Sequence, residues 1–128
     1  MPSAASPRIL IADDSAVLRD LMSVIMTLEG YSVTVAEDGI GALEELSRDP
    51  PHLIIMDIEM PRLDGCEVCR QVKNAPETRD IPVLLVSGCG ETEVRALAAG
   101  ADDYLDKPFF LTEFQRRVEY LLRSKRGQ

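Results

Sequence analysis

Polar residues that can bind cations or phosphate stand at the ends of apolar segments of the chain. In the stretch "LIIMDIEMPRLDG", Asp57 follows four apolar residues, and the chain then turns at a proline and a glycine. The run "RILIA" likewise ends at the acidic pair Asp13 and Asp14. Ser87 closes the run "PVLLVS", and Lys107 comes directly after "DDYLD". Carboxylates can bind a hard divalent cation or attack phosphorus, and ammonium or hydroxyl groups can contact phosphoryl oxygens.

The apolar segments that carry these residues predict the strands of a parallel sheet. Runs with strand character cover five ranges, 8–13, 31–36, 52–57, 82–87 and 102–106. Between and after them the apolar residues take helical spacing, which predicts helices over 15–29, 39–48, 65–74, 91–99 and 112–124. Regular alternation of strands and helices with short connections is typical of an α/β fold.

The composition of each run predicts its place in the sheet. The runs at 8–13, 52–57 and 82–87 are apolar on both faces, as strands covered by helices on both sides are. The run at 31–36 alternates in polarity and the run at 102–106 is rich in aspartate, so both are placed at edges. The sequence therefore predicts a single-domain, doubly wound (βα)5 sandwich with strand order 2-1-3-4-5, a flavodoxin-like arrangement.

Two helices carry more specific predictions. The helix at 15–29 is expected to turn one apolar face inward, made of Val17, Leu18, Leu21, Val24, Ile25 and Leu28. The helix at 112–124 is expected to begin with the capping box "TEFQ", in which Thr112 is the cap and Gln115 reaches back to it. Gly30 is expected to end the first of these helices.

The carboxyl ends of the predicted strands should bring the polar residues into one cluster, because ligands of such sheets bind at that edge. Three converging carboxylates, Asp13, Asp14 and Asp57, repel one another and raise at least one pKa unless a cation lies among them. Mg²⁺ suits this position, since it binds one or two carboxylates together with waters and a phosphate oxygen. Asp57 is then a candidate metal ligand and a candidate nucleophile, with Lys107 supplying positive charge for an incoming phosphoryl group.

The composition limits the classes of function. The chain has 128 residues, which suits one domain, expected at 8–124 between a mobile polar tail at 1–7 and a tail at 125–128. A net charge of −8 argues against direct binding of nucleic acid, because the phosphate backbone would be repelled. No apolar run reaches the roughly 20 residues of a membrane span, and the first residues do not resemble a secretion signal. Three cysteines form no disulfide framework, so a cytoplasmic location is expected.

The thiols and the single histidine carry no strong functional signal. Cys66 and Cys69 form one C-x-x-C pair, which provides too few ligands for a structural zinc site and is expected as two thiols on a helix. His52, the only histidine, precedes a strand, away from the acidic residues, and is expected at the surface.

The motifs at the strand ends resemble those of one signalling family. Four of them, "IADDS", "MDIEMPRLDG", "LLVSGC" and "YLDKPF", lie within residues 8–123 and resemble the receiver domain of response regulators in two-component signalling, the CheY-like family. The resemblance implies that Asp57 is the phosphoacceptor. It also implies that Asp14 binds Mg²⁺ (or Mn²⁺) directly, that Asp13 does so through water, and that the backbone carbonyl of Glu59 completes the protein ligands.

The same resemblance implies which residues respond to phosphorylation. Ser87 matches the hydroxyl that moves to the phosphoryl group, and Tyr104 matches the aromatic residue that turns inward behind it. Lys107 matches the lysine that pairs with the phosphate, and it precedes Pro108 at a peptide bond that is cis in the family. The response is expected at the surface formed by the fourth helix, the fifth strand and the fifth helix.

Partners also follow from the resemblance. A histidine kinase or a histidine phosphotransfer protein is expected to donate the phosphoryl group from its own phosphohistidine. The domain is expected to catalyse only its own phosphorylation and dephosphorylation, and so not to be an enzyme acting on a separate substrate. Output is expected through a downstream protein or an output domain outside these residues, from a monomer or a phosphorylation-dependent dimer. A stand-alone regulator, a relay intermediate and one domain of a larger protein all remain open.

Two other classes suit the same fold. A flavodoxin-like FMN binder needs a phosphate-cradling loop after the first strand, and "ADDSA" offers carboxylates that would repel phosphate. A phosphotransferase of the haloacid-dehalogenase type would use Asp57 as its nucleophile. That class requires a second acid two residues later, which Glu59 only loosely imitates, and it would turn over free phosphomonoesters.

Overall fold

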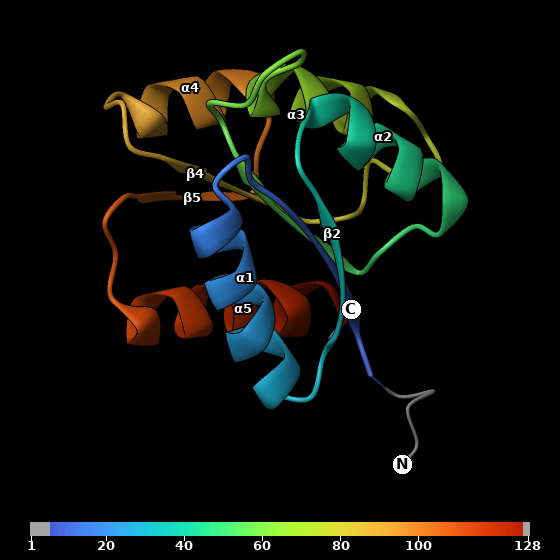
Figure 1. The fold of residues 1–128 in the computed structure, drawn as a ribbon. Helices are drawn as coiled ribbons and strands as arrows, with labels where there is room; N and C mark the ends of the chain where they lie inside the picture. The colour runs from blue at the N-terminus through green and yellow to red at the C-terminus, as the bar shows by residue number, and fades with distance from the viewer. Residues whose placement is uncertain (1–5, 127–128) are drawn as a thin grey trace.

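Strands and helices alternate along residues 6–126, the part of the chain that the computed structural model describes (Figure 1). The ten elements, in chain order, are β1 (Arg8–Ala12), α1 (Ala16–Leu28), β2 (Ser32–Ala36), α2 (Gly39–Arg48), β3 (Leu53–Asp57), α3 (Gly65–Asn74), β4 (Val83–Ser87), α4 (Thr92–Ala99), β5 (Asp103–Asp106) and α5 (Leu111–Arg126). Each strand lies within one residue of its predicted bounds, and α2 and α3 match theirs. The predicted tails fall largely on residues 1–5 and 127–128, outside the described residues.

The five strands are all parallel and follow the order β2-β1-β3-β4-β5, which confirms the predicted topology. β1, β3 and β4 occupy the centre, and every residue of β3 and β4 is buried. The register pairs Ala12 with Met56, Asp57 with Val86, and Ser87 with Asp106. The carboxyl ends of the central strands therefore lie level with one another at one edge of the sheet.

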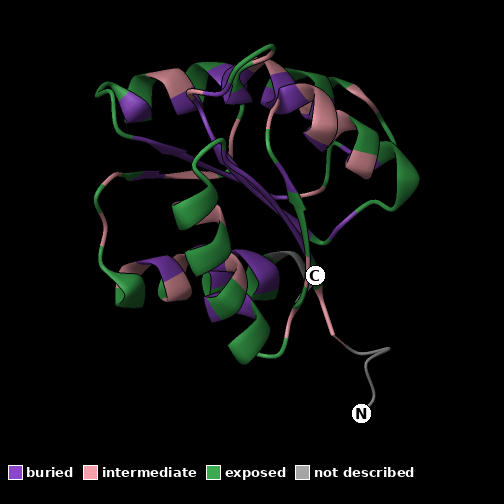
Figure 2. Cartoon of the chain, in the orientation of Figure 1, coloured by how far each residue is buried: buried purple, intermediate pink, exposed green. Residues whose placement is uncertain are grey.

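Helices cover both faces of the sheet and make two separate apolar cores. α1 and α5 lie on one face, and α2, α3 and α4 lie on the other (Figure 1). Figure 2 shows the buried residues concentrated on the central strands and on the helix faces turned toward them. This arrangement buries the central strands on both faces, and their carboxyl ends lie at the edge of the sheet where the loops begin.

Side-chain caps fix three of the helix starts at this edge. Ser15, Asp38 and Asp64 each accept a hydrogen bond from a backbone N–H in the first turn of α1, α2 and α3 respectively. Such caps satisfy a donor that the helix itself leaves unpaired. The start of α4 differs, because Glu91 lies in the left-handed region at φ 55° and makes no side-chain cap.

The predicted inward face of α1 was wrong in part. Met22, Ile25 and Met26 are the buried residues of this helix, and Leu18 packs against their core. Four residues predicted to face inward instead point to solvent, with exposed fractions of 81% for Val17, 46% for Leu21, 55% for Val24 and 82% for Leu28. Both stripes have helical spacing, so periodicity alone did not identify the stripe that contacts the sheet.

The predicted capping box of α5 was also wrong. The helix begins at Leu111, so Thr112 lies inside its first turn. The backbone carbonyl of Phe110 accepts hydrogen bonds from the N–H groups of Glu113 and Phe114. The side-chain amide of Gln115 donates to Glu29 at the end of α1, at 3.2 Å, rather than reaching back to Thr112. Among residues 6–126, no helix combines the length and apolar character needed to cross a membrane.

Candidate functional site

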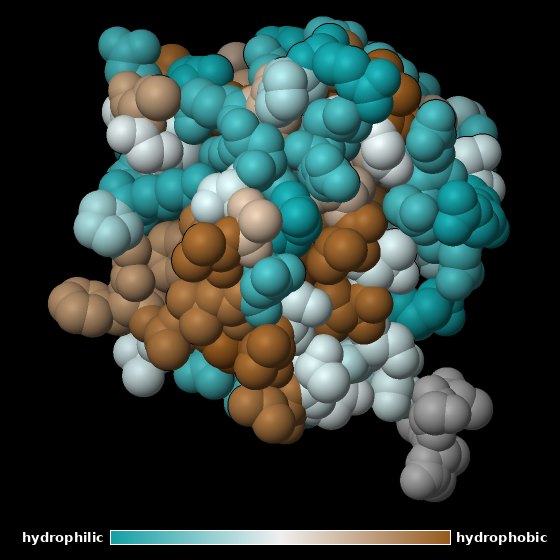
Figure 3. All heavy atoms as spheres, viewed as in Figure 1, coloured by the Kyte–Doolittle hydropathy of each residue, from teal (hydrophilic) through white to brown (hydrophobic). Residues whose placement is uncertain are grey.

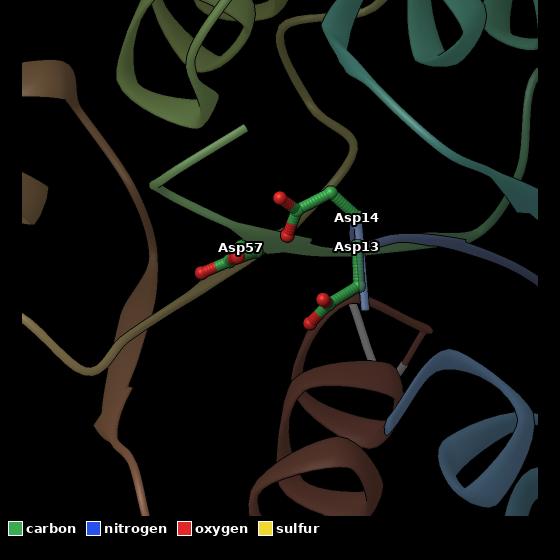
Figure 4. A group of neighbouring side chains, drawn as sticks. All are labelled: Asp13, Asp14 and Asp57. Carbon is green, nitrogen blue, oxygen red and sulfur yellow. The ribbon is translucent and has the colours of Figure 1, made fainter. Parts of the chain in front are cut away.

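Three carboxylates meet where β1 and β3 end. Asp13 and Asp14 follow β1, Asp57 is the last residue of β3, and one oxygen from each lies within 4.8 Å of the others (Figure 4). Asp13 is fully buried, Asp57 is 4% exposed, and Asp14 is open to solvent. The structure therefore brings the three predicted acids together, with one of them at the entrance.

The β1–α1 loop holds Asp13 by several hydrogen bonds. The backbone N–H of Asp13 donates to the Ala36 carbonyl at 3.2 Å, which continues the sheet pairing beyond β1. Its Oδ1 accepts the backbone N–H of Ser15 at 2.8 Å, and its carbonyl accepts the Arg19 guanidinium at 2.8 Å. The buried carboxylate is thus held in a fixed orientation toward the neighbouring strand end.

Lys107 supplies the positive charge of the cluster. Its Nζ lies 3.3 Å from Asp13 Oδ2 and 3.4 Å from Asp57 Oδ1. The Lys107 backbone N–H donates to the Ser87 carbonyl at 2.8 Å, and the Lys107–Pro108 peptide bond is cis, as the resemblance implied. Burial lowers the pKa of Lys107, but the charges of Asp13 and Asp57 outweigh it and raise that pKa above its ordinary value.

Asp57 is held in an environment that disfavours its charged form. Burial, followed by the negative charge of Asp13, raises the pKa of Asp57 to about 6, although Lys107 partly offsets both. Asp57 Oδ1 is buried, and its contact with Lys107 Nζ at 3.4 Å is a long ion pair without good hydrogen-bond geometry. A buried carboxylate oxygen with only this long ion pair, beside two further carboxylates, belongs to a ligand set that suits a hard divalent cation. Asp13, Asp14 and Asp57 therefore fit Mg²⁺ chemically.

Gly65 allows the β3–α3 loop to pack against the end of β3. Its N–H donates to the Ile58 carbonyl at 2.9 Å, and Ile58 in turn donates to the Val86 carbonyl at 2.8 Å. A Cβ atom at residue 65 would collide with the Asp57 carbonyl oxygen and lie 3.0 Å from Ile58 Cα. Because only glycine permits this close approach, the β3–α3 loop can pack directly against the backbone of Asp57.

Ser87 makes a contact that the sequence did not reveal. Its Oγ donates to Glu59 Oε2 at 2.7 Å, and Arg95 on α4 donates to the same oxygen at 2.7 Å. Burial alone would raise the pKa of Glu59, but the bonds from Ser87 and Arg95 outweigh it and lower that pKa. The resemblance placed the backbone carbonyl of Glu59 at the metal and did not predict the contacts of its carboxylate with Ser87 and Arg95. Both charged residues, Glu59 and Arg95, could be seen in the sequence, but nothing in the sequence showed that they lie close together.

Tyr104 lies outside the acidic cluster. It belongs to β5, pairs with Leu85 of β4, and is partly exposed while packing against the core under α4. Partial desolvation and the nearby carboxylate of Glu93 raise the pKa of its phenol. The aromatic residue is thus turned partly to solvent in this structure.

The remaining candidates give no second site. Cys66 and Cys69 are buried on α3, and burial raises the pKa of the Cys69 thiol to about 11, so that it stays protonated. Within the described residues, the acidic trio is the one group of three or more metal-binding side chains close enough to share an ion. Nothing in this part of the chain supports a zinc site at the C-x-x-C pair.

Comparisons with known proteins agree with this geometry. A family model described as "response regulator receiver domain" matches residues 9–119. The response regulator MprA of Mycobacterium leprae is 45% identical over 116 residues, which cover 91% of this chain and 51% of the relative. MprA of Mycobacterium tuberculosis is 43% identical over 123 residues, covering 96% of this chain and 54% of the relative. The chain thus spans about half the length of the curated relatives it matches.

Solved structures show the same fold in different protein contexts. The signal receiver domain of a signal transduction histidine kinase from Syntrophus aciditrophicus has a TM-score of 0.87 and 35% identity, covering 93% of this chain and 92% of that one. A CheY-like receiver domain protein from Methanospirillum hungatei has a TM-score of 0.88 and 26% identity, covering 96% and 98%. None of these matches favours the haloacid-dehalogenase or FMN-binding alternatives. The chain belongs to the response regulator receiver domain family of two-component signalling.

Proposed function

We propose that Asp57 accepts a phosphoryl group from a phosphohistidine of a histidine kinase or histidine phosphotransfer protein. The observation that carries this proposal is the buried Asp57 carboxylate, which lies beside two further acids and 3.4 Å from the Lys107 ammonium. A carboxylate oxygen attacks phosphorus, the new O–P bond forms, and the N–P bond of the donor breaks with its electron pair returning to the imidazole. Asp57 must be deprotonated to act in this way.

A divalent cation, Mg²⁺ or Mn²⁺, belongs to this proposal. Asp14 and Asp57 would hold it directly, Asp13 through water, and the backbone carbonyl of Glu59 would complete the protein ligands. When bound, it neutralises charge on the three acids and on the phosphoryl oxygens. Lys107 balances negative charge from the opposite side, because its Nζ already lies between Asp13 and Asp57. Ser87 provides a hydroxyl that can donate to a phosphoryl oxygen.

The exposed apolar stripe on α1 supports a docking role for that helix. Val17, Leu21, Val24 and Leu28 are all exposed, and Figure 3 shows apolar side chains gathered over α1. The helix begins three residues after Asp13, so the stripe runs away from the acidic cluster. A contiguous exposed apolar patch of this kind marks a protein–protein contact. The proposed occupant is an apolar surface of the donor protein next to its phosphohistidine.

Output and activity class are also part of the proposal. The surface of α4, β5 and α5 is proposed to carry the signal to a downstream protein or to an output domain beyond these residues, with a monomer or a phosphorylation-dependent dimer as the acting species. The chain itself is proposed to catalyse only its own phosphorylation and hydrolysis, in the cytoplasm. Turnover of free phosphomonoesters would contradict this class.

The test is labelling by acetyl phosphate, followed by intact mass. We expect one phosphoryl group per chain, dependent on Mg²⁺ and lost when EDTA is added beforehand. Asp57→Asn should abolish the modification, whereas Asp80→Asn, an exposed acid of the α3–β4 loop, should leave it unchanged. Equal labelling of the Asp57→Asn protein would remove Asp57 from the role of phosphoacceptor.

A further inference from the structure

One carboxylate oxygen connects the phosphorylation site to α4. Glu59 Oε2 accepts both the Ser87 hydroxyl and the Arg95 guanidinium, each at 2.7 Å. Ser87 is fully buried, and its Oγ also accepts the backbone N–H of Cys89 at 3.2 Å. A serine hydroxyl has a single hydrogen to donate. Ser87 can therefore donate to Glu59 or to a phosphoryl oxygen, but not fully to both.

The start of α4 lacks a side-chain cap, so its position depends on other contacts such as the Arg95–Glu59 ion pair. Glu91 has a left-handed backbone and no capping side chain, and the buried Thr92 hydroxyl has no hydrogen-bond partner among the described residues. Val94 and Leu97 are both about two-thirds exposed, at 67% and 68%, so the short helix buries little apolar surface. The ion pair between Arg95 and Glu59 ties this weakly capped helix to the β3–α3 loop.

We propose that the Glu59 carboxylate is a positioning residue that holds Ser87 in a resting orientation and anchors α4, and that it competes with the phosphoryl group for the Ser87 hydroxyl. This proposal rests on the proposed phosphorylation of Asp57. When Ser87 turns to the phosphoryl oxygen, Glu59 Oε2 loses one of its two side-chain donors as a second negative group arrives nearby. Repulsion from the new charge displaces the Glu59 carboxylate, and α4, which Arg95 ties to that carboxylate, shifts with it.

Binding of beryllofluoride, a stable mimic of the phosphoryl group, tests the competition. With Mg²⁺ present, and with backbone amide shifts as the readout, Glu59→Ala should bind beryllofluoride about tenfold more tightly than wild type. A tenfold ratio of dissociation constants corresponds to about 1.4 kcal/mol, which is the order of free energy expected for one hydrogen bond to a charged group. Glu59→Gln keeps an acceptor for Ser87 without the charge, and should show a smaller gain.

A double-mutant cycle separates competition for the hydroxyl from simple charge repulsion. In the Ser87→Ala background the hydroxyl is absent, so Glu59→Ala should no longer improve beryllofluoride binding. An undiminished gain in that background would show that Glu59 acts only through its charge, and it would overturn the competition. Equal affinity of wild type and Glu59→Ala would overturn it as well.

Amide hydrogen exchange of the unmodified protein, without metal or phosphate, tests the anchor. Glu59→Ala and Arg95→Gln should each speed exchange of the α4 amides by about tenfold, as loss of one charged contact predicts. Arg70→Gln breaks a comparable exposed pair with Glu67 on α3 and should leave α4 unchanged. Unaltered α4 exchange in both variants would overturn the anchor. Failure of wild type to bind beryllofluoride would instead count against the proposed function.

Discussion

The Asp57 carboxylate and the Lys107 ammonium lie 3.4 Å apart, and yet the pKa of Asp57 is raised to about 6 while that of Lys107 is also raised. Burial and the charge of Asp13 together outweigh the single nearby cation on Asp57. Lys107 responds to two carboxylates, and its ammonium form gains from both. At neutral pH, ionisation of Asp57 in this cluster therefore costs free energy that the single ammonium does not offset. This cost has measurable consequences.

The first prediction concerns stability against pH. A carboxyl group whose folded pKa is raised from 3.8 to about 6 contributes stability that is fully present below pH 3.8 and is lost as pH rises from there through 6. Asp57→Asn should therefore be more stable than wild type at pH 8, by at most about 3 kcal/mol for a shift of about two units. Urea unfolding from below pH 3.8 to pH 8, without divalent cations, measures the difference.

The pH dependence of that difference is the diagnostic feature. The two proteins should approach equal stability only below about pH 3.8, where Asp57 is protonated in both the folded and the unfolded state. Asp80→Asn, at an exposed site, should give a small difference that does not vary with pH in the same way. A stability gain for Asp57→Asn that is constant from pH 4.5 to 8 would mean that burial of the charge is not its cause.

The second prediction concerns metal binding. Mg²⁺ should raise the melting temperature of the wild-type protein, since an ion that binds only the folded state at 100 times its Kd adds about 2.7 kcal/mol. The effect should be larger at pH 7.5 than at pH 5, because Asp57 must lose its proton to act as a ligand. Asp14→Asn should lose most of the shift, whereas Asp80→Asn should retain it. An Mg²⁺ shift of the same size in Asp14→Asn would place the ion elsewhere.

The sequence was sufficient for the sheet because burial leaves a direct mark on strands. β3 and β4 are buried at every residue, so nearly all of their side chains are apolar. The polar residues that end these strands, Asp57 and Ser87, could therefore be recognised in the sequence. Parallel strands in one sheet end at the same edge. For that reason Asp13, Asp57 and Lys107 could be assigned to one cluster before any distance was known.

Contacts between side chains distant in sequence left no such mark. Glu59 and Arg95 are 36 positions apart, and their pairing depends on how α4 lies over the sheet. The two apolar stripes of α1 share one period, so the choice of the buried one depended on whether Met22 and Met26 or Val17 and Leu21 met the core. Thr112 satisfied a capping pattern, but the backbone carbonyl of Phe110 already accepted bonds from the first turn.

The third prediction concerns the glycines around the site. Gly65→Ala should destabilise the fold by about 2 kcal/mol or more, because the added Cβ meets backbone atoms of Asp57 and Ile58 that cannot move aside cheaply. Gly88→Ala is the matched control, since its Cβ would lie 3.6 Å from Lys107 Cβ, an ordinary contact. Denaturant unfolding of both variants provides the comparison. Equal loss of stability in the two would show that the close approach at residue 65 is not what requires glycine.

The fourth prediction concerns the exposed stripe of α1. Leu21→Ser and Val24→Ser change side chains that are about half exposed, so the free energy of unfolding should change by less than about 1 kcal/mol. Labelling by acetyl phosphate should also stay at the wild-type rate, because neither residue belongs to the acidic cluster. Transfer from a phosphohistidine-bearing donor protein should fall by about tenfold or more, as loss of an apolar contact at a protein interface predicts.

A control on a different face completes this test. Leu97→Ser alters an exposed apolar residue of α4, which is 68% exposed and lies on the opposite face of the sheet from α1. It should preserve transfer from the donor if α1 is the docking helix. Comparing phosphotransfer with acetyl phosphate labelling in the same variants separates loss of docking from loss of chemistry. Should Leu97→Ser slow the transfer while Leu21→Ser does not, the donor binds at α4, and the apolar stripe of α1 must have another partner.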